Sequence, residues 1–153
     1  MCWPQGEGDL GRRLRNGSDR AWAEGAAGVI LLGADSPTLP PSFLDATLRR
    51  LNRYDAIFGP CEDGGYYLLA SRRPCEALFD HIDWGGSEVA DQTRRRAKEA
   101  KLKLHELPYW YDLDRFDDLR LAKRDLLRYE MTKLPEFAAL HETIERLLEG
   151  SKA

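Results

Sequence analysis

The chain has 153 residues with a formal net charge of −3; charged residues make up 32% of it and hydrophobic residues 42%. This length suits one α/β or helical domain, and the apolar content is too high for a disordered chain. The acidic balance argues against a general nucleic-acid binder, no apolar run is long enough to cross a membrane, and the N-terminus lacks the features of a signal peptide. We therefore expect a cytoplasmic protein with no nucleic-acid and no membrane partner.

The three cysteines, Cys2, Cys61 and Cys75, lie far apart in the sequence. An odd count without C-x-x-C spacing is typical neither of a disulfide framework nor of a zinc site. We expect three reduced thiols.

Helices and strands are predicted to alternate along the first half of the chain. The apolar run 28–33 is bounded by glycines and predicts a strand buried on both faces. Prolines end it and open the next helix. The elements predicted for this half are a glycine-rich loop (5–11), a helix continuing through 18–26, the strand 28–33, a helix with an apolar stripe (43–51), a strand (56–60), a turn (61–65) and a strand (66–70).

The second half continues the alternation and ends in helices. Ser87 is the predicted N-cap of a long helix. The elements predicted here are a short helix near 75–81, the helix from Glu88 to about Ala100, a strand (102–107), a loop (110–114), a helix (117–131) with Leu119, Ala122, Leu126 and Tyr129 on its inner face, and a last helix from Leu134-Pro135.

This alternation predicts an α/β layered fold with a mostly parallel sheet. Ligands of such sheets bind beyond the carboxyl ends of the strands. Acidic and glycine-rich loops follow the predicted strands after Gly33, Pro60 and Leu107. The pattern thus places three candidate loops at one end of the sheet.

Two of these loops carry the carboxylates that are candidate metal ligands. Asp35 follows a buried strand directly, and Asp112 and Asp114 lie in the loop before the helix at 117. Paired carboxylates suit a magnesium ion that also binds phosphate oxygens. Asp-Ser-Pro is also common turn chemistry, so Asp35 as a cap of the following turn remains an alternative.

The segments 62–66 and 5–11 allow two interpretations each. Glycines in Glu62-Asp63-Gly64-Gly65-Tyr66 permit close backbone approach to a ligand, yet Asp-Gly and Gly-Gly also signal a tight hairpin. A glycine-rich loop that opens a helix can hold phosphate, but residues 5–11 lack the Gly-Lys-Ser/Thr of a Walker loop.

Taken together, five segments resemble one family in order and spacing. They are Gln5-Gly-Glu-Gly-Asp-Leu-Gly-Arg-Arg-Leu14, Gly33-Ala-Asp-Ser-Pro-Thr-Leu-Pro40, Gly59-Pro-Cys-Glu-Asp-Gly-Gly-Tyr-Tyr-Leu68, Trp84-Gly-Gly-Ser-Glu-Val89 and Trp110-Tyr-Asp-Leu-Asp114. This set resembles a bacterial family of GT-A-like glycosyltransferases, formerly of unknown function and often labelled arsenosugar-biosynthesis glycosyltransferase. The family belongs to the nucleotide-diphospho-sugar transferase superfamily, and the resemblance covers residues 3 to about 121.

The resemblance implies a Rossmann-like GT-A layered sheet and a role for each segment. Asp35 and Asp114 would hold a divalent metal, Mg or Mn, and Glu62 or Asp63 would be the catalytic base. The nucleotide would contact Gln5, Gly6, Gly8, Asp9 and Arg13. The substrate side of the cleft would be formed by Gly64, Gly65, Tyr66, Trp84, Ser87 and Glu88.

The chain departs from the family pattern in three places. Residues 115–119 replace the usual Thr-Pro-Glu-Asp-Leu, and Gly86 stands where the family has Thr. Family members begin with a strand and a Pro-Gly-x-x-Lys-Thr-Arg-Leu segment, so about 60–80 residues are expected to be missing here. We expect residues 1–153 to form one GT-A-like domain, its C-terminal two-thirds, with a helical extension from about residue 117 and an open, apolar sheet edge.

The resemblance implies a metal-dependent glycosyltransferase that uses a nucleotide-diphosphate sugar and a small-molecule acceptor. A nucleotidyltransferase of the guanylyltransferase type, which takes a nucleoside triphosphate, would use the same metal site. A third hypothesis is an inactive fragment that pairs with another chain, including a second copy in a homo-oligomer.

Overall fold

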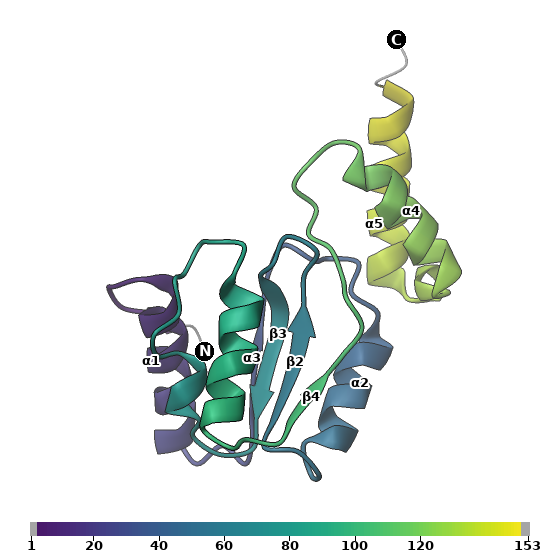
Figure 1. Cartoon of the computed structure of the whole chain (residues 1–153). Coiled ribbons are helices and arrows are strands. Elements are labelled where there is room, and N and C mark those ends of the chain that lie inside the picture. The colour runs from purple at the N-terminus through teal and green to yellow at the C-terminus, as the bar shows by residue number, and fades with distance from the viewer. Residues whose placement is uncertain (1–2, 151–153) are drawn as a thin grey trace.

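The computed structural model describes residues 3–150, so Cys2 lies outside the described residues (Figure 1). One four-stranded sheet has the order β1-β3-β2-β4. Its strands are β1 (Val29–Leu32), β2 (Ala56–Pro60), β3 (Tyr66–Ser71) and β4 (Leu104–Glu106). β2 and β4 pair in parallel, whereas β3 is antiparallel to both of its neighbours.

The α/β class is confirmed, but the sheet is mixed and not mostly parallel. Strands β1, β2 and β4 run in one direction, as βαβ crossovers require. β3 runs against them because the Asp63-Gly64-Gly65 turn makes a tight hairpin of β2 and β3, one of the two interpretations of that segment.

Helices cover both faces of the sheet (Figure 1). α2 (Pro41–Arg50) packs through Phe43 and Leu44 on the face that carries Ile57 and Leu68. On the other face, α3 (Val89–Glu99) and the short helix η1 (Glu76–Leu78) pack against Phe58 and Leu69. α1 (Leu10–Ala23) contacts β1. Side chains therefore alternate along β2 and β3 between two hydrophobic cores, one on each face of the sheet.

The prediction that residues 28–33 are buried on both faces is wrong. Val29 is buried, but Leu32 is 52% exposed. β1 is an edge strand that, among the described residues, pairs only with β3. The strands buried on both faces are β2 and β3.

The N-cap prediction for Ser87 is also wrong, although the helix is present. α3 begins at Val89, and Glu88 occupies the cap position without a side-chain hydrogen bond to the helix. The carbonyl of Gly64 instead accepts a hydrogen bond from the Ala90 amide at 2.8 Å. The β2–β3 turn thus satisfies a donor that a capping side chain usually satisfies.

The C-terminal residues form a helical hairpin with a core of its own. α4 (Asp118–Arg128) and α5 (Pro135–Gly150), joined by η2 (Met131–Lys133), enclose Ala122, Leu126 and Ile144. Tyr129 does not line this core as predicted: it is 39% exposed and its ring lies 5.6 Å from that of Trp110. No helix among residues 3–150 has the length and apolar character needed to span a membrane.

Candidate functional site

Three loops that follow β1, β2 and β4 meet at one end of the sheet and are joined by backbone hydrogen bonds. The Leu113 amide donates to the Asp35 carbonyl at 2.8 Å, and the Glu62 amide donates to the Trp110 carbonyl at 3.2 Å. Trp110 also forms an isolated parallel bridge with Cys61. These bonds extend the β2–β4 pairing beyond the strands and hold the acidic loops side by side.

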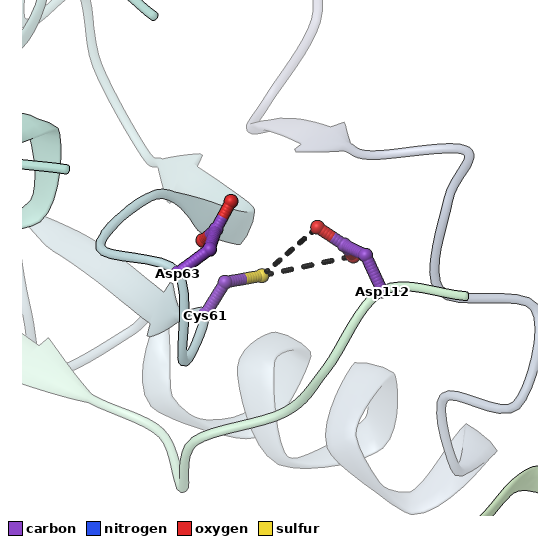
Figure 2. Close-up of side chains that lie close together, drawn as sticks. All are labelled: Cys61, Asp63 and Asp112. Atoms are coloured by element: carbon purple, nitrogen blue, oxygen red, sulfur yellow. Dashed lines mark hydrogen bonds between the residues drawn. The ribbon is translucent and has the colours of Figure 1, made fainter. Parts of the chain in front are cut away.

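At this junction the side chains of Cys61, Asp63 and Asp112 form a cluster (Figure 2). One potential ligand atom from each lies within 4.8 Å of the others. The Cys61 thiol points at the Asp112 carboxylate, with Sγ 3.6 and 3.7 Å from its two oxygens. On the other side, the Ser36 hydroxyl donates to Asp112 Oδ1 at 2.5 Å. Asp112 is therefore oriented by both neighbouring loops.

Cys61 acts in this cluster as a neutral hydrogen-bond donor. Its side chain is buried, and burial, reinforced by the negative charges of Asp112 and Asp63, raises the pKa of the thiol well above its usual range. A thiol held in this state donates to a carboxylate instead of competing with it for a cation.

The carboxylates of the site are not neutralised by the protein. Among residues 3–150, neither Lys nor Arg forms an ion pair with Asp63, Asp112 or Asp114. Asp63 Oδ1 accepts a hydrogen bond from the Gly65 amide at 2.8 Å, which leaves its second oxygen available. Uncompensated carboxylate oxygens that converge on one point are the donor set of a hard divalent cation, so the residues fit Mg or Mn.

Two cavities flank the cluster. The first, of about 270 Å³, is walled by aromatic side chains and a backbone turn, with Tyr66 and Trp84 in a T-shaped contact at 6.1 Å. The second, of about 320 Å³, is lined by Glu62, Asp114 and Arg115. Asp63 and Asp112 line both cavities, so the cluster lies where the two adjoin.

The structure brings together most of the residues predicted for the substrate. The first cavity is lined by Gly65, Tyr66, Trp84 and Ser87. Gly64 and Glu88 lie at its edge: Gly64 packs against the Ser87 backbone, and Glu88 is the exposed cap residue of α3. Of the two candidate bases, Asp63 lines both cavities and Glu62 only the second.

The predicted metal pair, Asp35 and Asp114, occupies the same junction but is not the cluster itself. Asp114 lines the second cavity beside Asp63 and Asp112. Asp35 is exposed, and its carbonyl holds the loop that carries Asp112. The sequence analysis named Asp112 as a candidate but not Cys61 or Ser36. Cys61 is 51 residues and Ser36 is 76 residues from Asp112 in the chain, so no local sequence pattern indicates that their side chains contact its carboxylate.

The predicted nucleotide residues lie apart from the carboxylates. Asp9 caps α1 by accepting from the Arg12 amide at 2.8 Å, and it lines a third cavity, of about 480 Å³. Gln5, Gly6 and Gly8 are exposed. No residue of the predicted nucleotide set, Gln5, Gly6, Gly8, Asp9 and Arg13, lines either cavity at the cluster.

The start of α1 nevertheless adjoins the first cavity. Leu10 lines that cavity, and Gly11 lies so close to the Trp84 indole that a β-carbon there would collide with it. Trp84 lines both the first and the third cavity. A ligand longer than either cavity could therefore pass along Trp84 from one to the other.

The fold and the site define a class of protein. The chain shares 33% identity and a TM-score of 0.83 with a crystal structure from Desulfovibrio desulfuricans G20 described as a putative nucleotide-diphospho-sugar transferase. The match covers 95% of this chain and 64% of that one, so the chain spans just under two thirds of the length of its structural relative.

The family model described as "Uncharacterized protein conserved in bacteria (DUF2064)" matches residues 1–86. The chain belongs to this family. No curated protein matches it. The expected family of formerly unknown function is therefore confirmed, as is the expected likeness of fold to a nucleotide-diphospho-sugar transferase.

Proposed function

We propose that the chain is a transferase that binds a nucleotide-diphosphate sugar with a divalent cation and passes the sugar to a small hydroxyl acceptor. The observation that carries this proposal is the convergence of three loops on Asp63 and Asp112 at the carboxyl end of the sheet. The fold of the D. desulfuricans protein supports the substrate class. A cytoplasmic location is part of the proposal.

The cation would be held by Asp63 and Asp112, with Asp114 and Asp35 on the same rim. When bound, it would neutralise the charge that develops on the departing diphosphate. Ser36 and Cys61 would keep the Asp112 carboxylate aimed at this position through their hydrogen bonds.

The first cavity suits the sugar. Carbohydrates present apolar ring faces and a rim of hydroxyls, and Tyr66 and Trp84 offer aromatic surface beside the polar Ser87 and Asp63. In the transfer, the acceptor oxygen bonds to the anomeric carbon as the bond from that carbon to the diphosphate breaks. The diphosphate would leave with the electron pair, and the acceptor proton would go to Glu62, which lines the second cavity, because Asp63 would be engaged with the cation.

Product analysis tests this proposal. The chain is incubated with Mn²⁺ and either nucleotide sugars or nucleoside triphosphates. Release of nucleoside diphosphate from a nucleotide sugar is expected, whereas pyrophosphate release from a triphosphate would show nucleotidyl transfer instead.

Binding measurements separate both reactions from an inactive chain. Calorimetry with Mn²⁺ and several nucleoside diphosphates should show binding that Asp112→Asn weakens strongly. A folded sample that binds none of them would contradict the proposal and favour a chain that acts by association with another.

A further inference from the structure

A further polar hollow lies at the opposite end of the sheet from the carboxylates. It has a volume of about 580 Å³ and is lined by Arg49, Arg50, Arg53, Tyr54 and His105. Tyr54 comes just before β2, whereas Cys61 follows its last residue, so β2 separates the two sites along its whole length. His105 belongs to β4 and the arginines to the end of α2 and the turn after it.

The charge of this hollow is one-sided. Three guanidinium groups line it and no carboxylate does. Within the described part of the chain, none of the three arginines forms an ion pair, and Arg50 only donates to the Ala46 carbonyl, at 3.3 Å. Two acids directly follow lining residues in sequence, and both are already paired: Asp55 with Arg72 and Arg73, and Glu106 with Arg94.

This one-sidedness stands out because the chain as a whole is acidic. Basic residues in the last turn of a helix complement its dipole, which accounts for Arg49 and Arg50. It does not account for Arg53, which lies beyond α2, nor for His105, which comes from a different element. Lys103 adds a further positive charge, with Nζ 4.8 Å from the centre of the Tyr54 ring.

We propose that this hollow binds a small phosphate-bearing anion, a phosphate or a diphosphate group. Guanidinium groups offer paired N–H donors that match phosphate oxygens, and charge-assisted bonds of this kind are the strong ones. Tyr54 and His105, whose rings lie 4.8 Å apart, also line the hollow, and their hydroxyl and imidazole are further hydrogen-bond donors. The proposal is independent of the transferase reaction.

Calorimetry with inorganic diphosphate in the presence of EDTA tests anion binding at this hollow. EDTA removes metal ions and so prevents any metal-dependent binding of diphosphate at Asp63 and Asp112. The unaltered chain should bind, and the double variant R49Q/R53Q should bind about tenfold more weakly or worse. The matched control R128Q/R146Q removes the same charge from α4 and α5 and should leave affinity unchanged. Equal losses in both variants would show a general charge effect and overturn the proposal, as would no binding by the unaltered chain.

A second readout locates the anion without depending on the fold of a variant. The described chain has three histidines, His81, His105 and His141. Burial and the charge of Arg50 lower the pKa of His105, while Glu106 opposes them. Diphosphate should shift the His105 imidazole signal in the proton NMR spectrum and raise its pKa, leaving the other two in place. Binding that leaves the His105 signal unmoved would overturn the assignment.

Discussion

At the scale of single residues, Asp112 holds the site together. Its carboxylate accepts hydrogen bonds from Ser36 after β1 and from Cys61 after β2, while its own segment follows β4. Each donor fixes the carboxylate in a direction that the backbone alone does not dictate. Groups that orient a ligand in this way commonly change metal affinity by about 10- to 100-fold when they are removed.

The variant Cys61→Ala is therefore expected to lower Mn²⁺ affinity by about tenfold, because Asp112 loses one of its two orienting donors. Isothermal titration with Mn²⁺ measures the effect. Cys75→Ala is the matched control, since Cys75 is a buried free thiol like Cys61 and packs in the core with residues of α3. Equal Mn²⁺ affinity in the two variants would contradict an orienting role for Cys61.

A second residue prediction concerns Gly64, whose φ of +90° is unfavourable for other residues. A β-carbon there would also collide with the Ser87 carbonyl. Gly85 has the same φ of +90° but open space around it. Gly64→Ala should cost more than about 1 kcal/mol of unfolding free energy, and clearly more than Gly85→Ala, which reports the backbone strain alone.

Urea unfolding of the two alanine variants gives the comparison directly. Similar losses at both positions would mean that the contact between Gly64 and Ser87 does not hold the turn against α3.

At the scale of elements, the strands and helices were predictable where the pattern was long and apolar. The strand 56–60 and the helices at α2 and α4 follow from local periodicity. The cap of α3 could not be predicted in this way, because the Ala90 amide donates to the carbonyl of Gly64, which lies 26 residues earlier in the chain. Turn chemistry allowed a hairpin at 61–65, but the antiparallel place of β3 between β1 and β2 depends on pairing that no local segment encodes.

Asp55 connects three strands through its carboxylate: it lies just before β2 and contacts residues just before β4 and just after β3. Its carboxylate accepts from the Lys103 amide at 2.9 Å and pairs with Arg72 and Arg73. The Lys103 hydrogen bond, with the two arginines, lowers the pKa of Asp55 below its ordinary value of 3.8. Because the folded pKa is the lower one, this contribution to stability is present above about pH 4 and is lost as the pH falls through the folded value.

Asp55→Asn should therefore lower the free energy of unfolding by about 1 kcal/mol at pH 7 and by less at pH 3. Thermal unfolding between pH 3 and pH 7 checks this. Asp45→Asn is the control, because Asp45 is exposed on α2 and forms no ion pair with any residue from 3 to 150. A loss that is the same at both pH values would contradict the role assigned to the Asp55 charge.

At the scale of the whole molecule, the sheet has two edge strands, β1 and β4. Among the described residues β1 pairs only with β3 and β4 only with β2, and β1 exposes Leu32. The sequence predicted an open apolar edge from its family resemblance, and it also predicted that the strand 28–33 is buried on both faces. The exposure of Leu32 contradicts the second expectation, while the edge position of β1 leaves backbone groups on one side without a strand partner among the described residues.

The location of the site was predictable from topology, but its members were only partly so. Three acidic loops at the carboxyl ends of strands β1, β2 and β4 follow from the alternation of elements. Which carboxylates converge depends on side-chain directions in loops, which the sequence pattern does not give. Asp35 and Asp114 were the predicted metal ligands, whereas the cluster in the structure consists of Cys61, Asp63 and Asp112. The basic hollow at the far end gave no sequence signal, because His105 comes close to Arg49, Arg50 and Arg53 only through folding.

The central claim is that one cation joins the three acidic loops. Mn²⁺ added at substoichiometric amounts to the ¹⁵N-labelled chain broadens the amide signals of residues near the bound ion. We predict selective broadening at residues 35–36, 61–63 and 112–114, abolished by Asp112→Asn. Broadening centred elsewhere, or spread evenly over the acidic surface, would contradict it.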